Sequence, residues 1–102
     1  YMSRKALVLK SKNYSDFEFF GKWIELSSPK RMRVVKYLHE LSQETDGFIP
    51  QSKIREGAGI EGGEPITRVF VGSNLMGLLF EKDPDAGRQG GYRLNIFNHD
   101  QL

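Results

Sequence analysis

The sequence contains no cysteine, which excludes disulfides, thiolate nucleophiles and thiolate zinc sites. It has no apolar run approaching the roughly 20 residues that a membrane-spanning helix needs. The start of the chain also lacks the charged, apolar and small-residue regions of a signal peptide. We therefore expect a cytoplasmic protein with no membrane partner.

Sequence signals for metal binding and catalysis are also missing. The two histidines, His39 and His99, do not have the three- or four-residue spacing that zinc favours. No serine lies at a recognisable motif spacing from a histidine and an acid. We expect no metal, no cofactor and no catalytic residue, and hence a protein that is not an enzyme.

Charge is nearly balanced, but it is unevenly distributed. The 102 residues include 15 Lys and Arg against 13 Asp and Glu, for a net charge of +2. This small positive net charge is compatible with a polyanionic partner. The length of the chain leaves room for one domain. The basic residues of interest are four in one short stretch and two beside a glycine-rich loop: Lys30, Arg31, Arg33, Lys36, Arg88 and Arg93.

Residues 1–27 form a first section that is rich in aromatic side chains. The segment 6–9 predicts a short strand. The spacing of the aromatic residues over 15–26 fits a helix begun by a capping box at Ser15, and it equally fits a hairpin that turns at Gly21-Lys22. The sequence leaves both alternatives open.

Three helices are predicted after this section. Ser28 followed by Pro29 is typical of a helix start, and apolar residues at helical spacing extend this first helix to about Ser42. A second helix is predicted over 50–56, after the short extended pair 48–49. A third is predicted over 65–76, although Gly72 weakens it by about 1 kcal/mol relative to alanine.

After Gly77 the apolar period changes from helical to alternating. The segments 78–82 and 92–96 predict two strands, joined by the glycine-rich loop 83–91. The predicted fold class is therefore α+β, with three helices followed by a β-hairpin.

This order of elements resembles the winged helix-turn-helix superfamily of DNA-binding proteins. Residues 49–60 resemble the second helix of that family, in which an apolar residue opens the segment and Gly-Ile closes it. Residues 66–69, followed by Gly77-Leu78-Leu79, look like the recognition helix and its exit in bacterial transcription regulators of the MarR type. The loop 83–91 before Tyr92-Arg93-Leu94 resembles the wing.

The resemblance implies a winged helix-turn-helix domain over 28–97, a three-helix core plus a β-hairpin wing. The N-terminal section 1–27 would extend it and pack on the core or on a dimer partner, and 98–102 would form a tail. The implied function is sequence-specific binding of double-stranded DNA by a small prokaryotic or phage transcription regulator. Two alternatives stay open: a plasmid replication or partition protein, and a winged-helix module that binds another protein.

The layout also implies which residues would contact DNA. A recognition helix enters the major groove, where each base pair presents a distinct pattern of donors and acceptors. The expected base contacts are Glu64, Thr67, Arg68 and Asn74. The expected phosphate contacts, which set register, are Lys30, Arg31, Gln51, Ser52 and Lys53. The expected wing contacts are Arg88, Gln89 and Arg93.

A homodimer is the expected assembly. A three-helix winged domain can be complete without the aromatic residues of the N-terminal section. We therefore expect residues 6–26 to cover the core and to extend into a contact with a second copy, which would give two-fold symmetry suited to a palindromic site.

Overall fold

The structure is a computed structural model that describes residues 7–84 and 91–96. The described part is a small α+β domain, and it confirms the predicted fold class at that level. Its elements in chain order are β1 (Leu7–Leu9), β2 (Asp16–Phe19), β3 (Lys22–Glu25), α2 (Pro29–Ser42), α3 (Gln51–Ala58), α4 (Ile66–Val69), α5 (Leu75–Leu79), β4 (Phe80–Lys82) and β5 (Tyr92–Leu94).

The aromatic-rich section is a hairpin rather than a helix. Strands β1, β2 and β3 form an antiparallel sheet in that order. Phe17 and Phe19 are buried on its inner face, because side chains alternate between the two faces of a strand. Phe20 and Gly21, with φ of 52° and 82°, make the turn. Two consecutive left-handed residues give the twist that a two-residue hairpin favours. The aromatic segment therefore follows the alternating spacing of a strand and not the spacing of a helix.

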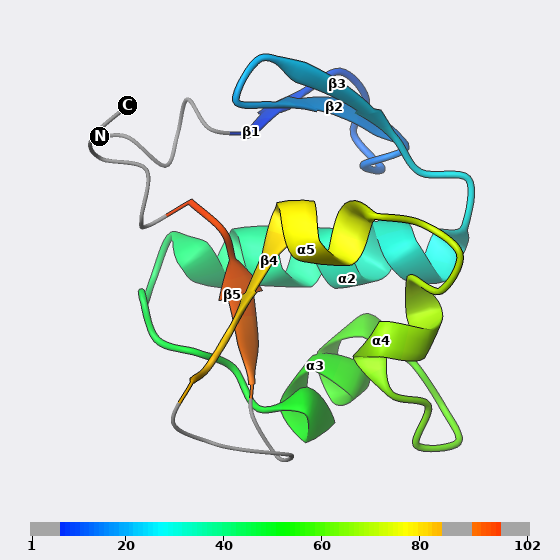
Figure 1. The fold of residues 1–102 in the computed structure, drawn as a ribbon, viewed down its shortest axis with the longest axis vertical. Helices are drawn as coiled ribbons and strands as arrows, with labels where there is room; N and C mark the ends of the chain where they lie inside the picture. Colours follow the sequence, from blue (N-terminus) through cyan, green and yellow to red (C-terminus); the bar gives the residue numbers. More distant parts are fainter. Residues whose placement is uncertain (1–6, 85–90, 97–102) are drawn as a thin grey trace.

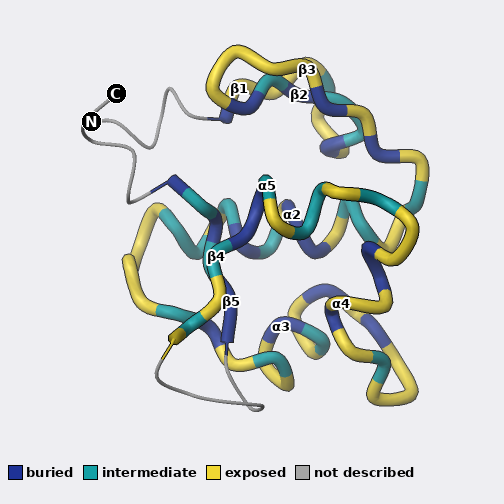
Figure 2. Tube along the Cα trace, in the orientation of Figure 1, coloured by how far each residue is buried: buried dark blue, intermediate teal, exposed yellow. Residues whose placement is uncertain are grey.

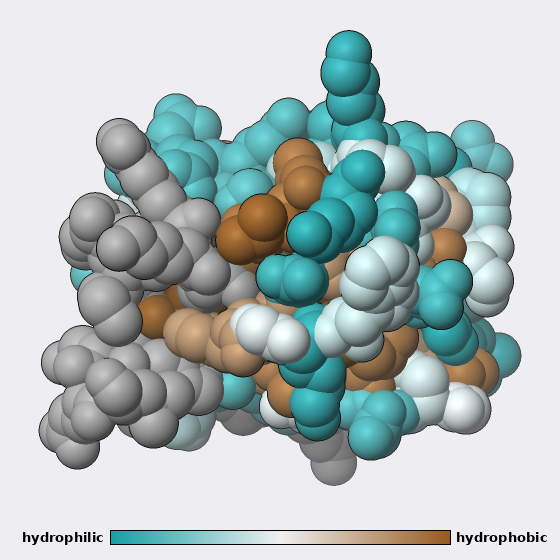
Figure 3. Space-filling model, turned by 90° about the horizontal axis from the view of Figure 1, so that it is seen from above, coloured by the Kyte–Doolittle hydropathy of each residue, from teal (hydrophilic) through white to brown (hydrophobic). Residues whose placement is uncertain are grey.

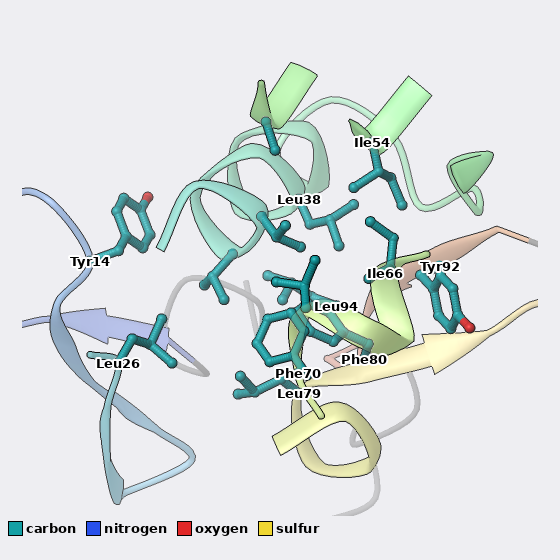
Figure 4. Packing of buried hydrophobic residues seen from close by; sticks show 14 of the residues in the cluster. Tyr14, Leu26, Leu38, Ile54, Ile66, Phe70, Leu79, Phe80, Tyr92 and Leu94 are labelled. Atoms are coloured by element: carbon teal, nitrogen blue, oxygen red, sulfur yellow. The ribbon is translucent and has the colours of Figure 1, made fainter. Parts of the chain in front are cut away.

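Helix α2 lies between this sheet and the helices α3 and α4, as Figures 1 and 2 show. Its bounds confirm the predicted first helix, with Pro29 at the start, although the side chain of Ser28 makes no capping hydrogen bond. Tyr14, which precedes the hairpin, joins the sheet to α2 through a 2.7 Å hydrogen bond to Nδ1 of His39. One hydrophobic cluster includes residues from both sides of α2, and Figure 4 shows Leu38 and Ile54 among its members.

The second predicted helix is present, but its predicted end is wrong. Helix α3 starts after Pro50 and continues two residues beyond Glu56, to Ala58. Gly59 ends it in the left-handed conformation, with φ of 68°, where glycine carries no steric penalty. The hydrogen bond from Ile60 N to Arg55 O completes the end of the helix.

The continuous third helix predicted over 65–76 is wrong. Helix α4 ends at Val69, and α5 begins only at Leu75. Gly72 has φ of 83°, which a right-handed helix does not allow. Figure 2 shows that the intervening segment is mostly exposed. Since Leu78 and Leu79 belong to α5, the following strand starts at Phe80 rather than at Leu78.

The second sheet is the hairpin of β4 and β5. Its register places Phe80 opposite Leu94 and Lys82 opposite Tyr92, and β5 ends at Leu94, two residues before the predicted end. Ile49 pairs with Tyr92 through an isolated antiparallel bridge, with both backbone hydrogen bonds at 2.9 Å. The extended pair before Pro50 thus lies beside the hairpin. This contact brings the start of α3 close to the loop end of β4 and β5.

Candidate nucleic-acid interface

An open cleft of about 500 Å³ lies where α3, α4 and the β4–β5 hairpin meet. The start of α3 contributes the largest share of its lining, and the ends of the two strands that flank the hairpin loop close it on the other side. The described lining residues are Pro50, Gln51, Ser52, Arg55, Pro65, Thr67, Lys82 and Tyr92.

The cleft is basic. Arg55 and Lys82 are the two cations of its lining, and none of its described lining residues is acidic. Within the described part of the chain, neither cation takes part in an ion pair. Burial raises the pKa of Tyr92 above its ordinary value of 10, so its phenol is protonated at neutral pH. The cleft therefore presents cations and donors, the groups that bind phosphate oxygens.

Three residues predicted to contact DNA line this cleft, namely Gln51, Ser52 and Thr67. Ser52 and Thr67 are exposed. Oε1 of Gln51 accepts a 3.3 Å hydrogen bond from the backbone N–H of Ile66 at the start of α4, so its carbonyl oxygen is already used inside the protein. Lys53, the neighbour of Ser52 on α3, is exposed and has no ion pair with another described residue.

The outer side of α4 continues the surface of the cleft. Its inner side is formed by Ile66 and Val69, which are buried, whereas Thr67 and Arg68 are exposed. Arg68 has no ion pair within the described residues. Asn74 is also exposed, but it lies beyond the helix break, directly before α5. The structure thus groups Thr67 with Arg68, and it separates both from Asn74 by the helix break.

Several predicted contact residues are engaged within the protein. Nζ of Lys30 forms a 2.8 Å ion pair with Oε1 of Glu64. Arg31 donates 2.9 Å hydrogen bonds from Nε to the carbonyl oxygen of Val69 and from Nη2 to that of Val71. These contacts hold α2 against α4. The predicted roles of Lys30, Arg31 and Glu64 in DNA binding stay predictions.

Arg93 is engaged in the same way. Its Nε donates to Oε1 of Glu81 at 3.0 Å, Nη1 donates to the backbone oxygen of Asp46, and the guanidinium lies 4.3 Å from the ring centroid of Phe48. The other two predicted wing contacts, Arg88 and Gln89, lie outside the described residues. Arg93 therefore fixes the hairpin to the loop that follows α2.

The cleft cations Arg55 and Lys82 were not among the predicted contact residues. Arg55 lies in the last turn of α3, and Lys82 ends β4, so no local motif links them. The one signal in the sequence is that Lys82 is the last residue before the predicted hairpin loop. Their convergence on one cleft depends on the packing of the hairpin beside α3 through Ile49 and Tyr92.

The described residues offer no metal site and no helix suited to a membrane. No cluster of three or more His, Asp or Glu side chains is positioned among them to hold an ion. None of the helices in that part of the chain has the length and apolar character needed to cross a bilayer.

Comparisons of the chain with protein-family models, with curated proteins and with solved structures give no match. The features that bear on function are therefore the geometry and charge of the cleft and of the α4 surface beside it.

Proposed function

We propose that this protein binds double-stranded DNA as a winged helix-turn-helix domain. In this proposal α3 and α4 are the helix-turn-helix pair, α2 supports them, and the β4–β5 hairpin is the wing. The observation that carries the proposal is the open cleft at their junction, with two cations and no acid in its described lining. A basic groove flanked by a helix and a hairpin suits a DNA strand, which carries one phosphate every 3.4 Å or so.

The cleft would receive the phosphate backbone of one strand. Arg55 and Lys82 approach it from two different elements, and Ser52 and Thr67 supply hydroxyl donors between them. The start of α3 faces the same cleft, and the N-terminus of a helix favours an anion. These contacts would set position and orientation without reading sequence.

Sequence would be read by α4. Arg68 is exposed beside the cleft and has no ion pair within the described part of the chain, so its guanidinium is available for two hydrogen bonds to guanine. One such pair supplies about 1–3 kcal/mol of discrimination against the wrong base. The helix is four residues long, so the readout would cover few base pairs.

The proposed role is that of a small prokaryotic or phage transcription regulator. A plasmid replication or partition protein would use the same surface in the same way. Sequencing the genomic fragments that the protein binds separates these roles, because promoters would be enriched in one case and replication or partition sites in the other.

A homodimer through the N-terminal sheet stays a prediction. On the outer face of that sheet, Val8 and Trp23 are 43% and 55% exposed on either side of Glu18. Figure 3, viewed from the sheet side, shows apolar surface in pieces between hydrophilic groups. Glu25, two residues after Trp23 in β3, adds an exposed charge to the same face. Sedimentation equilibrium tests this, and a monomer at all concentrations would contradict it.

The test of DNA binding is the double variant Arg55→Gln/Lys82→Gln. It removes both cleft cations, and we expect it to weaken binding to all duplex sequences alike. The matched control is Lys12→Gln/Lys22→Gln, which changes the net charge equally at two exposed positions of the N-terminal section. Equal binding by the two double variants would contradict the proposed cleft.

A protein-interaction module is the second candidate function. The observation that favours it is the short, interrupted α4, with the exposed apolar Val71 two residues after its end. A partner protein held by this surface would bind with little dependence on salt, whereas phosphate contacts give a steep dependence.

A further inference from the structure

Val71 is the most exposed large apolar side chain among the described residues, at 69%. It lies two residues after the end of α4. Ile66 and Val69 of that helix, and Phe70 directly after it, are buried in the core. Thr67, Arg68 and Val71 are the exposed residues of this segment, so they share its outer side. Because Thr67 also lines the cleft, Val71 extends the same surface away from the cleft.

The backbone at Val71 is fixed although the side chain is exposed. Its carbonyl oxygen accepts a 2.9 Å hydrogen bond from Nη2 of Arg31, and its N–H donates to the carbonyl oxygen of Arg68 at 3.2 Å. Arg31 also bonds the carbonyl oxygen of Val69, and its guanidinium lies 5.6 Å from the ring centroid of Phe70. A partner that contacts Val71 would therefore lose little affinity to the ordering of this segment.

The surface beside Val71 is open. A Cβ atom added to Gly72 would meet no atom within 4 Å. Apart from the two chain neighbours of Gly72, no described protein atom therefore fills the space next to the backbone at this position.

We propose that Val71 reads a thymine by contact with its C5-methyl group in the major groove. This inference rests on the proposed DNA-binding function and adds a specificity residue to it. The thymine methyl is the apolar group on the major-groove edges of the base pairs, and a side chain such as Val71 is suited to contact it. The polar Thr67 and Arg68 on the same surface are suited to form hydrogen bonds with the donors and acceptors on those base edges.

The separation of Arg68 and Val71 along the chain predicts how far the thymine lies from the guanine that Arg68 reads. Arg68 and Val71 are three residues apart and are joined by a tight turn, in which Val71 N donates to Arg68 O at 3.2 Å. Three residues of such a turn rise by about 6 Å. Successive base pairs are about 3.4 Å apart. The thymine read by Val71 therefore lies one or two base pairs from the guanine read by Arg68.

The experiment compares thymine with deoxyuridine, which differs from thymidine only by the missing methyl group. A preferred duplex is selected from a random pool with the unaltered protein, and each thymine is then replaced singly. We expect one replacement to weaken binding about fourfold, the change that one buried methyl group supplies. The Val71→Ala variant should bind the thymine and deoxyuridine duplexes equally. Val8→Ala, an exposed valine on the sheet, should keep the fourfold difference.

Three results are decisive against the inference. If no single thymine is sensitive to replacement, or if Val71→Ala keeps the full sensitivity to deoxyuridine, Val71 does not read a methyl group. In both cases, salt-dependent binding to duplex DNA would still support the proposed function. Failure to bind any duplex at low salt overturns the proposed function and this inference together. Since Val71 is exposed, Val71→Ala should unfold at the same temperature as the unaltered protein, which checks that the variant is folded.

Discussion

At the scale of single residues, a basic side chain on a predicted DNA interface is not necessarily available to bind DNA. Arg31 and Arg93 belong to the basic residues that the sequence marks for DNA, yet each donates its hydrogen bonds to the protein itself. Arg55 and Lys82 were not predicted, and they line the cleft without an ion pair to another described residue. Whether a basic side chain is bonded within the protein depends on residues far apart in the sequence, so local sequence patterns cannot predict it.

Arg31 provides the first test at this scale. We expect Arg31→Ala to lower the free energy of unfolding by about 1–2 kcal/mol, because two backbone carbonyls lose a charged donor that is partly exposed to water. Lys36→Ala on the same helix is the control. Lys36 is exposed and has no ion pair within the described residues, so its loss should change stability by less than about 0.5 kcal/mol. Equal urea unfolding curves for the two variants would contradict the structural role of Arg31.

At the scale of elements, the reliable predictions came from strong local signals. Pro29 and Pro50 located the starts of α2 and α3, and the change of apolar period after Gly77 located the β4–β5 hairpin to within two residues. The segment 15–26 stayed ambiguous because its aromatic spacing fits both periods. The burial of Phe17 and Phe19 in the core, which depends on the rest of the chain, favours the hairpin.

The helix break between α4 and α5 could not be predicted from apolar spacing. Arg31, from α2, bonds the carbonyl oxygens of Val69 and Val71, which a continuous helix would use for Ser73 N and Leu75 N. Instead, Ser73 N donates to Phe70 O at 3.3 Å, in a tighter turn. The break therefore depends on a contact with a distant helix as well as on Gly72.

Replacement of Gly72 by alanine distinguishes the broken helix from a continuous one. With φ of 83° at Gly72, we expect Gly72→Ala to destabilise the protein by about 1–2 kcal/mol. In a continuous helix, the same change would stabilise it by about 1 kcal/mol. Gly77→Ala is the matched control. Gly77 lies in α5 with open space around it, so alanine there should stabilise by about 0.5–1 kcal/mol.

At the scale of the whole molecule, Tyr14 and His39 join the N-terminal sheet to α2. Burial lowers the pKa of His39 below its ordinary value of 6.5, and the neighbouring Glu40 opposes this shift with a smaller effect. The folded protein therefore favours neutral imidazole. As the pH falls below 6.5, the unfolded chain takes up the proton first, so the stability that depends on neutral His39 is lost.

We therefore expect the free energy of unfolding to fall between about pH 7 and about pH 5.5, where histidine is the side chain that ordinarily titrates. His39→Gln should remove most of this dependence, which urea unfolding at the two pH values measures. A dependence of the same size in His39→Gln would assign it to other groups and contradict the role of the Tyr14–His39 contact.

DNA binding through the cleft is tested most directly by the affinity for random duplex DNA over a salt series from about 50 to 200 mM. We expect the logarithm of the association constant to fall linearly with the logarithm of the salt concentration, with a slope of about 0.9 for each phosphate neutralised. Arg55→Gln/Lys82→Gln should reduce that slope by about two, while Lys12→Gln/Lys22→Gln leaves it unchanged. A flat response, or no binding at low salt, would contradict DNA binding through the cleft between α3, α4 and the hairpin.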